Sequence, residues 1–155
     1  IIYKTLKDNP TLVVHLFGAK NEEADSVEII NSSSLKKFSS RIINHVGKLS
    51  VQETYMKLGE CTHFIGHDSL LGHLAKLHQL PTLTISLGTV RPVETTPYGL
   101  NSFVLSPKTK CFPCFPDTEC NFFQCHADIS YQAVGEVLNS FLKDDLDVDQ
   151  IQKVG

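Results

Sequence analysis

Residues 63–88 read HFIGHDSLLGHLAKLHQLPTLTISLG, a segment with the pattern of a strand, a helix and a second strand. The runs at 63–66 and 82–87 are apolar and rich in branched residues, which is typical of strands buried on both faces of a parallel sheet. Between them, leucine and alanine recur at helical spacing over residues 69–79, and Pro81 ends that helix. Such a unit gives a right-handed crossover between two parallel strands.

The same alternation continues on both sides of this unit. The residues that follow the second upstream strand, Ser50-Val51-Gln52-Glu53, match a capping box and predict the start of a helix. In full, we expect strands over residues 11–17, 41–46 and 102–105, helices over 21–30, 50–60 and 130–143, and a polar, Ser-rich loop over 31–40. This order predicts an α/β fold, with a Rossmann-like parallel sheet flanked by helices.

The composition is that of an ordinary globular protein, because 41% of the 155 residues are hydrophobic and 20% are charged. A formal net charge of -3 argues against general nucleic-acid binding, and no apolar run is long enough to span a membrane. We expect one domain over residues 1–143 and an acidic tail over 144–155 that frays. Since the chain opens at Ile1 without an initiator methionine, we expect it to be part of a longer protein.

Ligands of parallel sheets bind beyond the carboxyl ends of the strands, a rule that selects three segments: residues 18–23, 67–73 and 88–99. The second segment begins a helix, whose free N–H groups and positive dipole end favour a phosphate. Ser69 adds a hydroxyl donor, Asp68 suits sugar hydroxyls, and His73 lies one turn inside the helix. The alternative is that Asp68 or Ser69 is an ordinary N-cap and His73 a half-buried helix residue.

The other two segments carry weaker signals of the same kind. Glu22 follows the first strand, where a carboxylate can accept both hydroxyls of a ribose, although a solvated glutamate in a first helical turn is the commoner case. Gly88 permits close approach of the backbone, and Thr89 and Arg91 can bind phosphate, unless this segment is only a turn. The glycine fingerprint of nicotinamide enzymes and the P-loop are both absent from the sequence.

Four of the five cysteines crowd into a Cys-rich loop, residues 107–127, with the spacing C-x2-C-x5-C-x4-C: Cys111, Cys114, Cys120 and Cys125. Four thiolates can hold a structural zinc or iron ion. Two alternatives stay open, namely reduced cysteines packed with nearby phenylalanines, or two disulfides. Thioredoxin-like chemistry is not expected, since no helix pattern follows Cys114 directly, and the H-x-E of zinc deaminases is missing. Cys61 stands apart from this group.

Taken together, these motifs resemble the C-terminal half of family 9 glycosyltransferases, the lipopolysaccharide heptosyltransferases and their relatives. The resemblance covers residues 11–142 and rests on the order and spacing of its pieces. They are GAKNEE at 18–23, DSLLGHLA at 68–75, PT at 81–82, GTVRP at 88–92, PYG at 97–99 and CFPC at 111–114 with two later cysteines.

The resemblance implies the donor-binding half of a GT-B enzyme, with a nucleotide-sugar donor such as ADP-heptose and a glycan or lipid acceptor. It implies that Glu22 holds the ribose, that Leu49 lies near the base, and that Asp68 and His73 contact the sugar or diphosphate. The pyrophosphate would be held by the backbone of Ser69, Leu70, Leu71 and Gly72. The catalytic base belongs to the N-terminal domain, so we expect no catalytic residue in this chain and no cofactor for catalysis.

Two residues depart from the family pattern. Leu70 stands where a glycine is usual, and Arg91 stands where an aspartate is common. A second hypothesis is therefore a non-catalytic interaction domain with a degenerate pocket, and a third is another nucleotide-binding α/β enzyme such as a sugar epimerase. For the glycosyltransferase we expect a cytoplasmic location, with the inner face of the membrane as one site of action, and no binding of nucleic acid.

Overall fold

The computed structural model describes residues 1–88, 91–99, 101–114, 120, 123–143 and 152–153. The chain forms two compact units, Ile1–Cys61 and Thr62–Gly155. Each unit has its own sheet and its own apolar core. That residues 1–143 act as a single domain remains a prediction.

The first unit is a two-stranded parallel sheet with short helices. Its elements are α1 (Ile2–Asp8), β1 (Val14–Leu16), the 3₁₀ helix η1 (Lys20–Glu22), α2 (Glu23–Asn31), the 3₁₀ helix η2 (Lys36–Arg41), β2 (Ile42–Asn44) and α3 (Val51–Leu58). The strands pair in register from Val14 opposite Ile42 to Leu16 opposite Asn44. Because the strands are parallel, the loops after β1 and β2 leave the sheet at the same edge.

An apolar core and one arginine hold this unit together. Leu6, Leu35 and Ile42 are buried against each other, with Val14 and Leu16 of β1 packed on them. Arg41 donates hydrogen bonds of 2.7 to 3.2 Å to four carbonyl oxygens of the segment that leads from α1 to β1, those of Leu6, Asn9, Pro10 and Leu12. This arginine therefore satisfies backbone groups that no strand or helix partner reaches.

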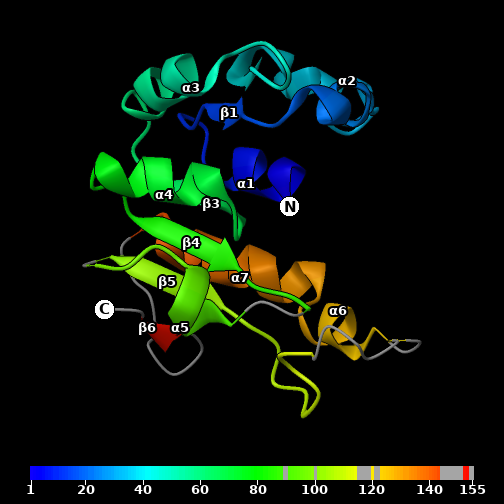
Figure 1. Cartoon of the computed structure of the whole chain (residues 1–155). Helices are drawn as coiled ribbons and strands as arrows, with labels where there is room; N and C mark the ends of the chain where they lie inside the picture. The colour runs from blue at the N-terminus through cyan, green and yellow to red at the C-terminus, as the bar shows by residue number, and fades with distance from the viewer. Residues whose placement is uncertain (89–90, 100, 115–119, 121–122, 144–151, 154–155) are drawn as a thin grey trace. The chain divides into compact units, whose positions relative to one another are not determined.

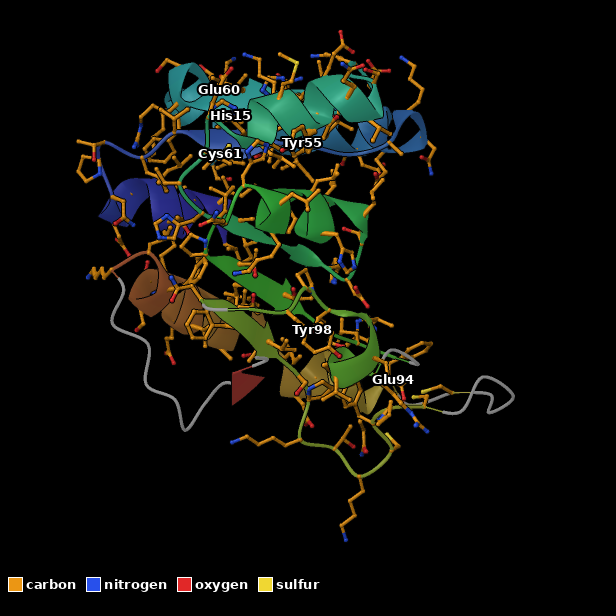
Figure 2. All side chains as sticks on the ribbon, turned by 60° about the vertical axis from the view of Figure 1, so that its left-hand side comes forward. His15, Tyr55, Glu60, Cys61, Glu94 and Tyr98 are labelled. Atoms are coloured by element: carbon orange, nitrogen blue, oxygen red, sulfur yellow. The ribbon has the colours of Figure 1, made fainter. Side chains whose placement is uncertain are left out.

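His15 and Phe17, which alternate with that core along the β1 segment, stack with His45, which follows β2. The rings of His15, Phe17 and His45 have centroids 5.1 to 6.3 Å apart and planes within 27° of parallel. Nδ1 of His15 lies 3.1 Å from Nε2 of His45. Burial lowers the pKa of His45, the positive charges of His15, Lys57 and Lys48 lower it further, and Glu60 opposes them. Figure 2 labels His15, Glu60 and Cys61 in this unit.

The second unit is built on a four-stranded sheet in the order β3-β4-β5-β6. Its elements are β3 (Phe64–His67), α4 (Leu70–Leu77), β4 (Thr82–Ile85), α5 (Pro92–Thr95), β5 (Ser102–Leu105), α6 (Gln124–Asp128), α7 (Tyr131–Phe141) and β6 (Gln152–Lys153). β3, β4 and β5 are parallel, and β6 joins β5 in the antiparallel direction. In Figure 1, α4 lies on one side of β4 and β5 and α7 on the other.

The two faces of this sheet differ in chemistry. On the α7 face, Leu83 and Leu105 are buried against four apolar residues of that helix, Val134, Val137, Leu138 and Phe141. Apart from Val104, the residues that alternate with them are small and polar, and Thr82 donates to the Ser102 hydroxyl at 3.3 Å in the interior. Small side chains on this face, with Gly72 and Ala75 buried on α4, let the helix approach the strands closely.

Most of the predicted elements are confirmed. All five predicted strands are present as β1 to β5, and Ser50 and Ser130 cap their helices through their hydroxyls, at Glu53 N–H and Ala133 N–H. The sequence did not predict α1, α5, α6 or β6. The Cys-rich loop was expected to run to Ala127, but α6 begins at Gln124. This helix was not predicted because it is too short to show an apolar repeat.

The expectation that the tail frays was wrong for Gln152–Lys153, which pairs with Phe103 and Val104 of β5. Backbone pairing with an edge strand needs no apolar signal in the paired residues, so the acidic composition did not reveal it. The remainder of the tail lies outside the described residues. Among the helices that the structure describes, none combines the length and hydropathy that crossing a membrane requires.

Replacement of Phe141 tests the core of the second unit. Its side chain is 2% exposed and meets the rings of His63 and Phe103 edge-on at 5.2 and 6.0 Å. We expect Phe141→Ala to lower the free energy of unfolding by about 3–5 kcal/mol, measured by urea denaturation. Tyr131→Ala in the same helix is the control, because Tyr131 is 70% exposed and its loss should cost below about 0.5 kcal/mol. Equal costs would contradict this description of the core.

The lowered pKa of His45 predicts acid sensitivity of the first unit. An unfolded histidine binds a proton near pH 6.5 and folded His45 binds it at lower pH, so the unfolded state holds more protons between the two values. Stability should therefore be complete above about pH 6.5 and fall as the pH drops through the folded pKa. In denaturation curves at several pH values, His45→Gln should reduce this loss, whereas His126→Gln, at an exposed position, should leave it unchanged. Identical pH profiles for all three proteins would rule out the effect.

Candidate functional site

The carboxyl edge of the second unit brings two predicted segments together. His67, the last residue of β3, is in register with Ile85, the last residue of β4, and the two strands are parallel. Asp68 follows the first strand directly, and Gly88 comes three residues after the second. Nδ1 of His67 lies 3.2 Å from the carbonyl oxygen of Ile85, which fixes the two strand ends side by side. The predicted placement of Asp68 and Gly88 at one edge is thus confirmed within this unit.

At the start of α4 the backbone has the usual N-cap conformation, but no side chain accepts a hydrogen bond from the first N–H groups of the helix. Ser69 is the N-cap residue with extended backbone, and its carbonyl accepts the N–H of Gly72 at 3.2 Å. Its hydroxyl makes no cap hydrogen bond. Ser69 is therefore the N-cap residue, as the alternative expected, but its hydroxyl is not used in the cap. This leaves the first N–H groups of α4 and the hydroxyl of Ser69 at one edge of the sheet, as an anion site requires.

The PYG segment packs directly on α4. A Cβ at Gly72 would lie 3.2 Å from Cγ of Pro97, and a Cβ at Gly99 would lie 3.1 Å from Cε of Lys76. Both glycines therefore permit a close approach between the segment and the helix, and φ of Gly99 is +122°, which side chains rarely adopt. His73 is exposed on the same helix. Two motifs that are separate in the sequence thus form one wall.

Lys76 is a member of this wall that the sequence alone did not single out. It is half-buried, and this burial lowers the pKa of its ammonium group. It stands four residues after Gly72, and this spacing puts both residues on one face of α4. Its position four residues after Gly72 of the DSLLGHLA motif was a sequence signal that could have identified Lys76.

Gly88 links the β4 edge to the Cys-rich loop. Its φ is +71°, and a Cβ there would meet no atom of the described part of the chain within 4 Å. Its carbonyl accepts the N–H of Cys114 at 2.9 Å. Thr89, predicted to bind phosphate, lies outside the described residues.

The described contacts of Arg91 are with residues outside α4. Its guanidinium donates to Glu94 at 3.3 Å, and both side chains are exposed. It lines a cleft of about 560 Å³ together with Lys108 and Thr109, and Asp68 and Ser69 do not line that cleft. Figure 2 labels Glu94 and Tyr98 on this side of the second unit. The described contacts therefore do not join Arg91 to the α4 site.

The first unit carries its predicted residues at its own carboxyl edge. Glu22 follows β1, and one of its oxygens accepts the N–H of Ala19 at 2.7 Å. A Cβ at Gly18 would lie 2.8 Å from that carboxylate, so a larger residue there would make the Glu22 side chain shift. Leu49 follows β2 and is half-buried just before the capped start of α3. The roles predicted for Glu22 and Leu49 remain predictions.

The four clustered cysteines are all free thiols and all lie among the described residues. Desolvation raises the pKa of Cys114, and the nearby thiols of Cys111, Cys120 and Cys125 raise it further. Within the described residues, no three His, Cys, Asp or Glu side chains already form a metal site.

Comparison with known proteins gives the family. The model of glycosyltransferase family 9 (heptosyltransferase) matches residues 3–123. A search of curated proteins gave no significant match. The solved structure of E. coli ADP-heptose LPS heptosyltransferase II has 21% sequence identity and a TM-score of 0.68 over 93% of this chain.

The likeness to the E. coli structure concerns the fold, and it confirms the predicted α/β class with parallel strands flanked by helices, as in GT-B enzymes. This chain spans only 40% of the length of that enzyme. The family model, in contrast, matches well over half of this chain. The chain therefore belongs to glycosyltransferase family 9.

Proposed function

We propose that this chain is the donor-binding half of an enzyme that moves a heptose-like sugar from a nucleoside diphosphate to a glycan or lipopolysaccharide-type acceptor. The family gives the reaction class. The one observation that carries the proposal is the start of α4, where the Ser69 hydroxyl is not used as a cap and helix N–H groups lie at the carboxyl edge of the sheet.

A diphosphate suits this place for electrostatic reasons. The N–H groups of Leu70 and Leu71 belong to the first helical turn, where the helix dipole favours negative charge. Lys76 adds a positive charge to the wall formed by α4 and Pro97. The carboxylate of Asp68 would repel phosphate, so its role is to accept hydroxyl groups of the sugar.

The remaining roles follow the family pattern. Glu22 would hold the ribose, Leu49 would lie near the base, and His73 would contact the sugar or the diphosphate. Direct displacement at the sugar needs a base, which we place in the other domain, and no cofactor. Helix N–H groups would stabilise the charge that develops on the departing diphosphate. Such an enzyme would work in the cytoplasm, at the inner face of the membrane where a lipid-linked acceptor is present.

One observation favours a second function, a non-catalytic interaction domain. The side chain of Leu70 is 56% exposed at the first position of α4, where a glycine is usual in the family pattern. Thermal unfolding of the full-length protein with ADP and other nucleoside diphosphates separates the two functions. A melting temperature that rises with ADP concentration supports the enzyme, and no rise with any nucleotide supports the interaction domain.

Removal of the Asp68 carboxylate tests its contact with the sugar. We expect Asp68→Ala in the full-length protein to weaken binding of the nucleotide sugar about 10-fold or more, because a charged hydrogen bond contributes about 1.5–3 kcal/mol. Binding of ADP alone should change little, and the melting temperature without ligand should stay the same. Calorimetric titration measures both affinities. Unchanged affinity for the nucleotide sugar would mean that Asp68 does not touch the donor.

Replacement of Leu70 tests whether its side chain hinders the phosphates. We expect Leu70→Gly to strengthen ADP binding, because a bare backbone lets phosphate oxygens reach the N–H groups. Leu77→Gly is the matched control, since Leu77 is 69% exposed at the other end of α4 and the same helix propensity is lost. A fluorescent ADP analogue measures both affinities. Equal effects of the two substitutions would show that Leu70 does not limit the site.

A further inference from the structure

The cleft that Arg91 lines lies between two segments that each follow a strand of the second unit. One wall is the start of α5, which comes after β4, and the other is formed by residues 106–109 and 112–113, which come after β5. Because these strands are parallel, with Ile85 opposite Leu105, both segments leave the sheet at its carboxyl edge. The volume of about 560 Å³ suits a small ligand.

The charged side chains of this cleft are positive. Arg91 and Lys108 line it together with the hydroxyl groups of Ser106 and Thr109, and the described lining residues include no carboxylate. Glu94 does not line the cleft, but it accepts from one nitrogen of the Arg91 guanidinium at 3.3 Å. A guanidinium has five N–H donors, so this contact leaves others for a ligand. The cleft therefore favours a negative group, although the whole chain carries a net charge of -3.

Backbone hydrogen bonds hold both walls. In α5, the carbonyl of Arg91 accepts the N–H of Glu94 at 2.9 Å. In the opposite wall, the carbonyl of Thr109 accepts the N–H of Phe112 at 3.1 Å, and the Thr109 hydroxyl donates to Gln124 of α6 at 3.2 Å. Walls that are already ordered lose little conformational entropy when a ligand binds.

Apolar surface forms the remainder of the lining. It is contributed by Pro92, Val93, Pro107, Phe112 and Pro113. Rigid proline rings and a flat phenyl ring can cover the C–H faces of a sugar, while the two cations bind a negative substituent on it. A bare inorganic ion would use the charges and leave this apolar surface in water. The lining therefore suits an acidic saccharide better than a free anion.

We propose that this cleft binds an anionic substituent, a phosphate or a carboxylate, of the acceptor saccharide, an assignment that rests on the proposed function. The donor is placed at the start of α4, and neither Asp68 nor Ser69 lines the cleft. Both places lie at the carboxyl edge of one sheet, where a second substrate must come to meet the sugar of the donor. Arg91 then serves the acceptor and not the donor diphosphate.

Calorimetric titration of the full-length protein, saturated with ADP, tests the assignment. The probes are glucuronate, glucose phosphorylated on its primary hydroxyl, and inorganic phosphate, and bound ADP keeps them from the diphosphate site. We expect one of the two acidic sugars to bind about 5-fold or more tightly than inorganic phosphate. Lys108→Gln should weaken that binding about 5-fold or more. Lys143→Gln is the matched control, because Lys143 is exposed and does not line the cleft.

A substitution that strengthens binding guards against mere loss of structure. Glu94→Gln removes the carboxylate that competes for Arg91, so the acidic sugar should bind about 2-fold or more tightly. Equal effects of Lys108→Gln and Lys143→Gln, or an acidic sugar that binds no better than inorganic phosphate, would overturn the assignment.

Titration with ADP in the same variants separates this cleft from the donor site. We expect Lys108→Gln to leave the affinity for ADP unchanged, and an equal loss of ADP and sugar binding would assign the cleft to the donor instead. Binding of ADP without binding of either acidic sugar overturns only the assignment of the cleft. Binding of an acidic sugar without binding of ADP overturns the proposed function.

Discussion

The close packing of α4 on the sheet is the constraint on which the site of the second unit depends. Gly72 and Ala75 are buried on the helix, and the strand face beneath has short side chains such as Thr82 and Ser102. A larger residue at Gly72 would press against Pro97. Because the helix lies this close, its N-terminus reaches the edge where β3 and β4 end, and the PYG segment closes against it.

Parallel pairing places the candidate donor-binding residues of each unit at the carboxyl edge of that unit's own sheet. Parallel strands all end at the same edge of their sheet, so the loops that follow them lie at that edge. In the second unit that edge holds Asp68, the start of α4 and Gly88, and in the first unit it holds Glu22 and Leu49. The same carbonyl of Gly88 that stands at the edge also receives the Cys-rich loop. This hydrogen bond therefore connects the carboxyl edge of the second unit with the Cys-rich loop.

The elements that sequence patterns predicted were those with strong local signals. Ser50 and Ser130 are caps because hydroxyls accept helix N–H groups, and the central strands follow from branched apolar runs. Side-chain partners were harder to foresee. The contact of Gly72 with Pro97 depends on tertiary geometry, which no spacing encodes. The contacts of Glu22 with Ala19 and of Arg91 with Glu94 are local, three residues apart, and depend on short helical turns. Short helices such as α5 and α6 lack the repeated turns that make periodicity visible.

Amide hydrogen exchange of the full-length protein tests the central claim most directly. The N–H groups at the start of α4 should be covered by the diphosphate of the donor and by little else. Exchange in the peptide over residues 67–73 should therefore slow when ADP is added and stay unchanged with adenosine, which has no phosphate. If ADP binds while exchange in this peptide stays unchanged, the phosphates lie elsewhere and the account of the α4 site is wrong.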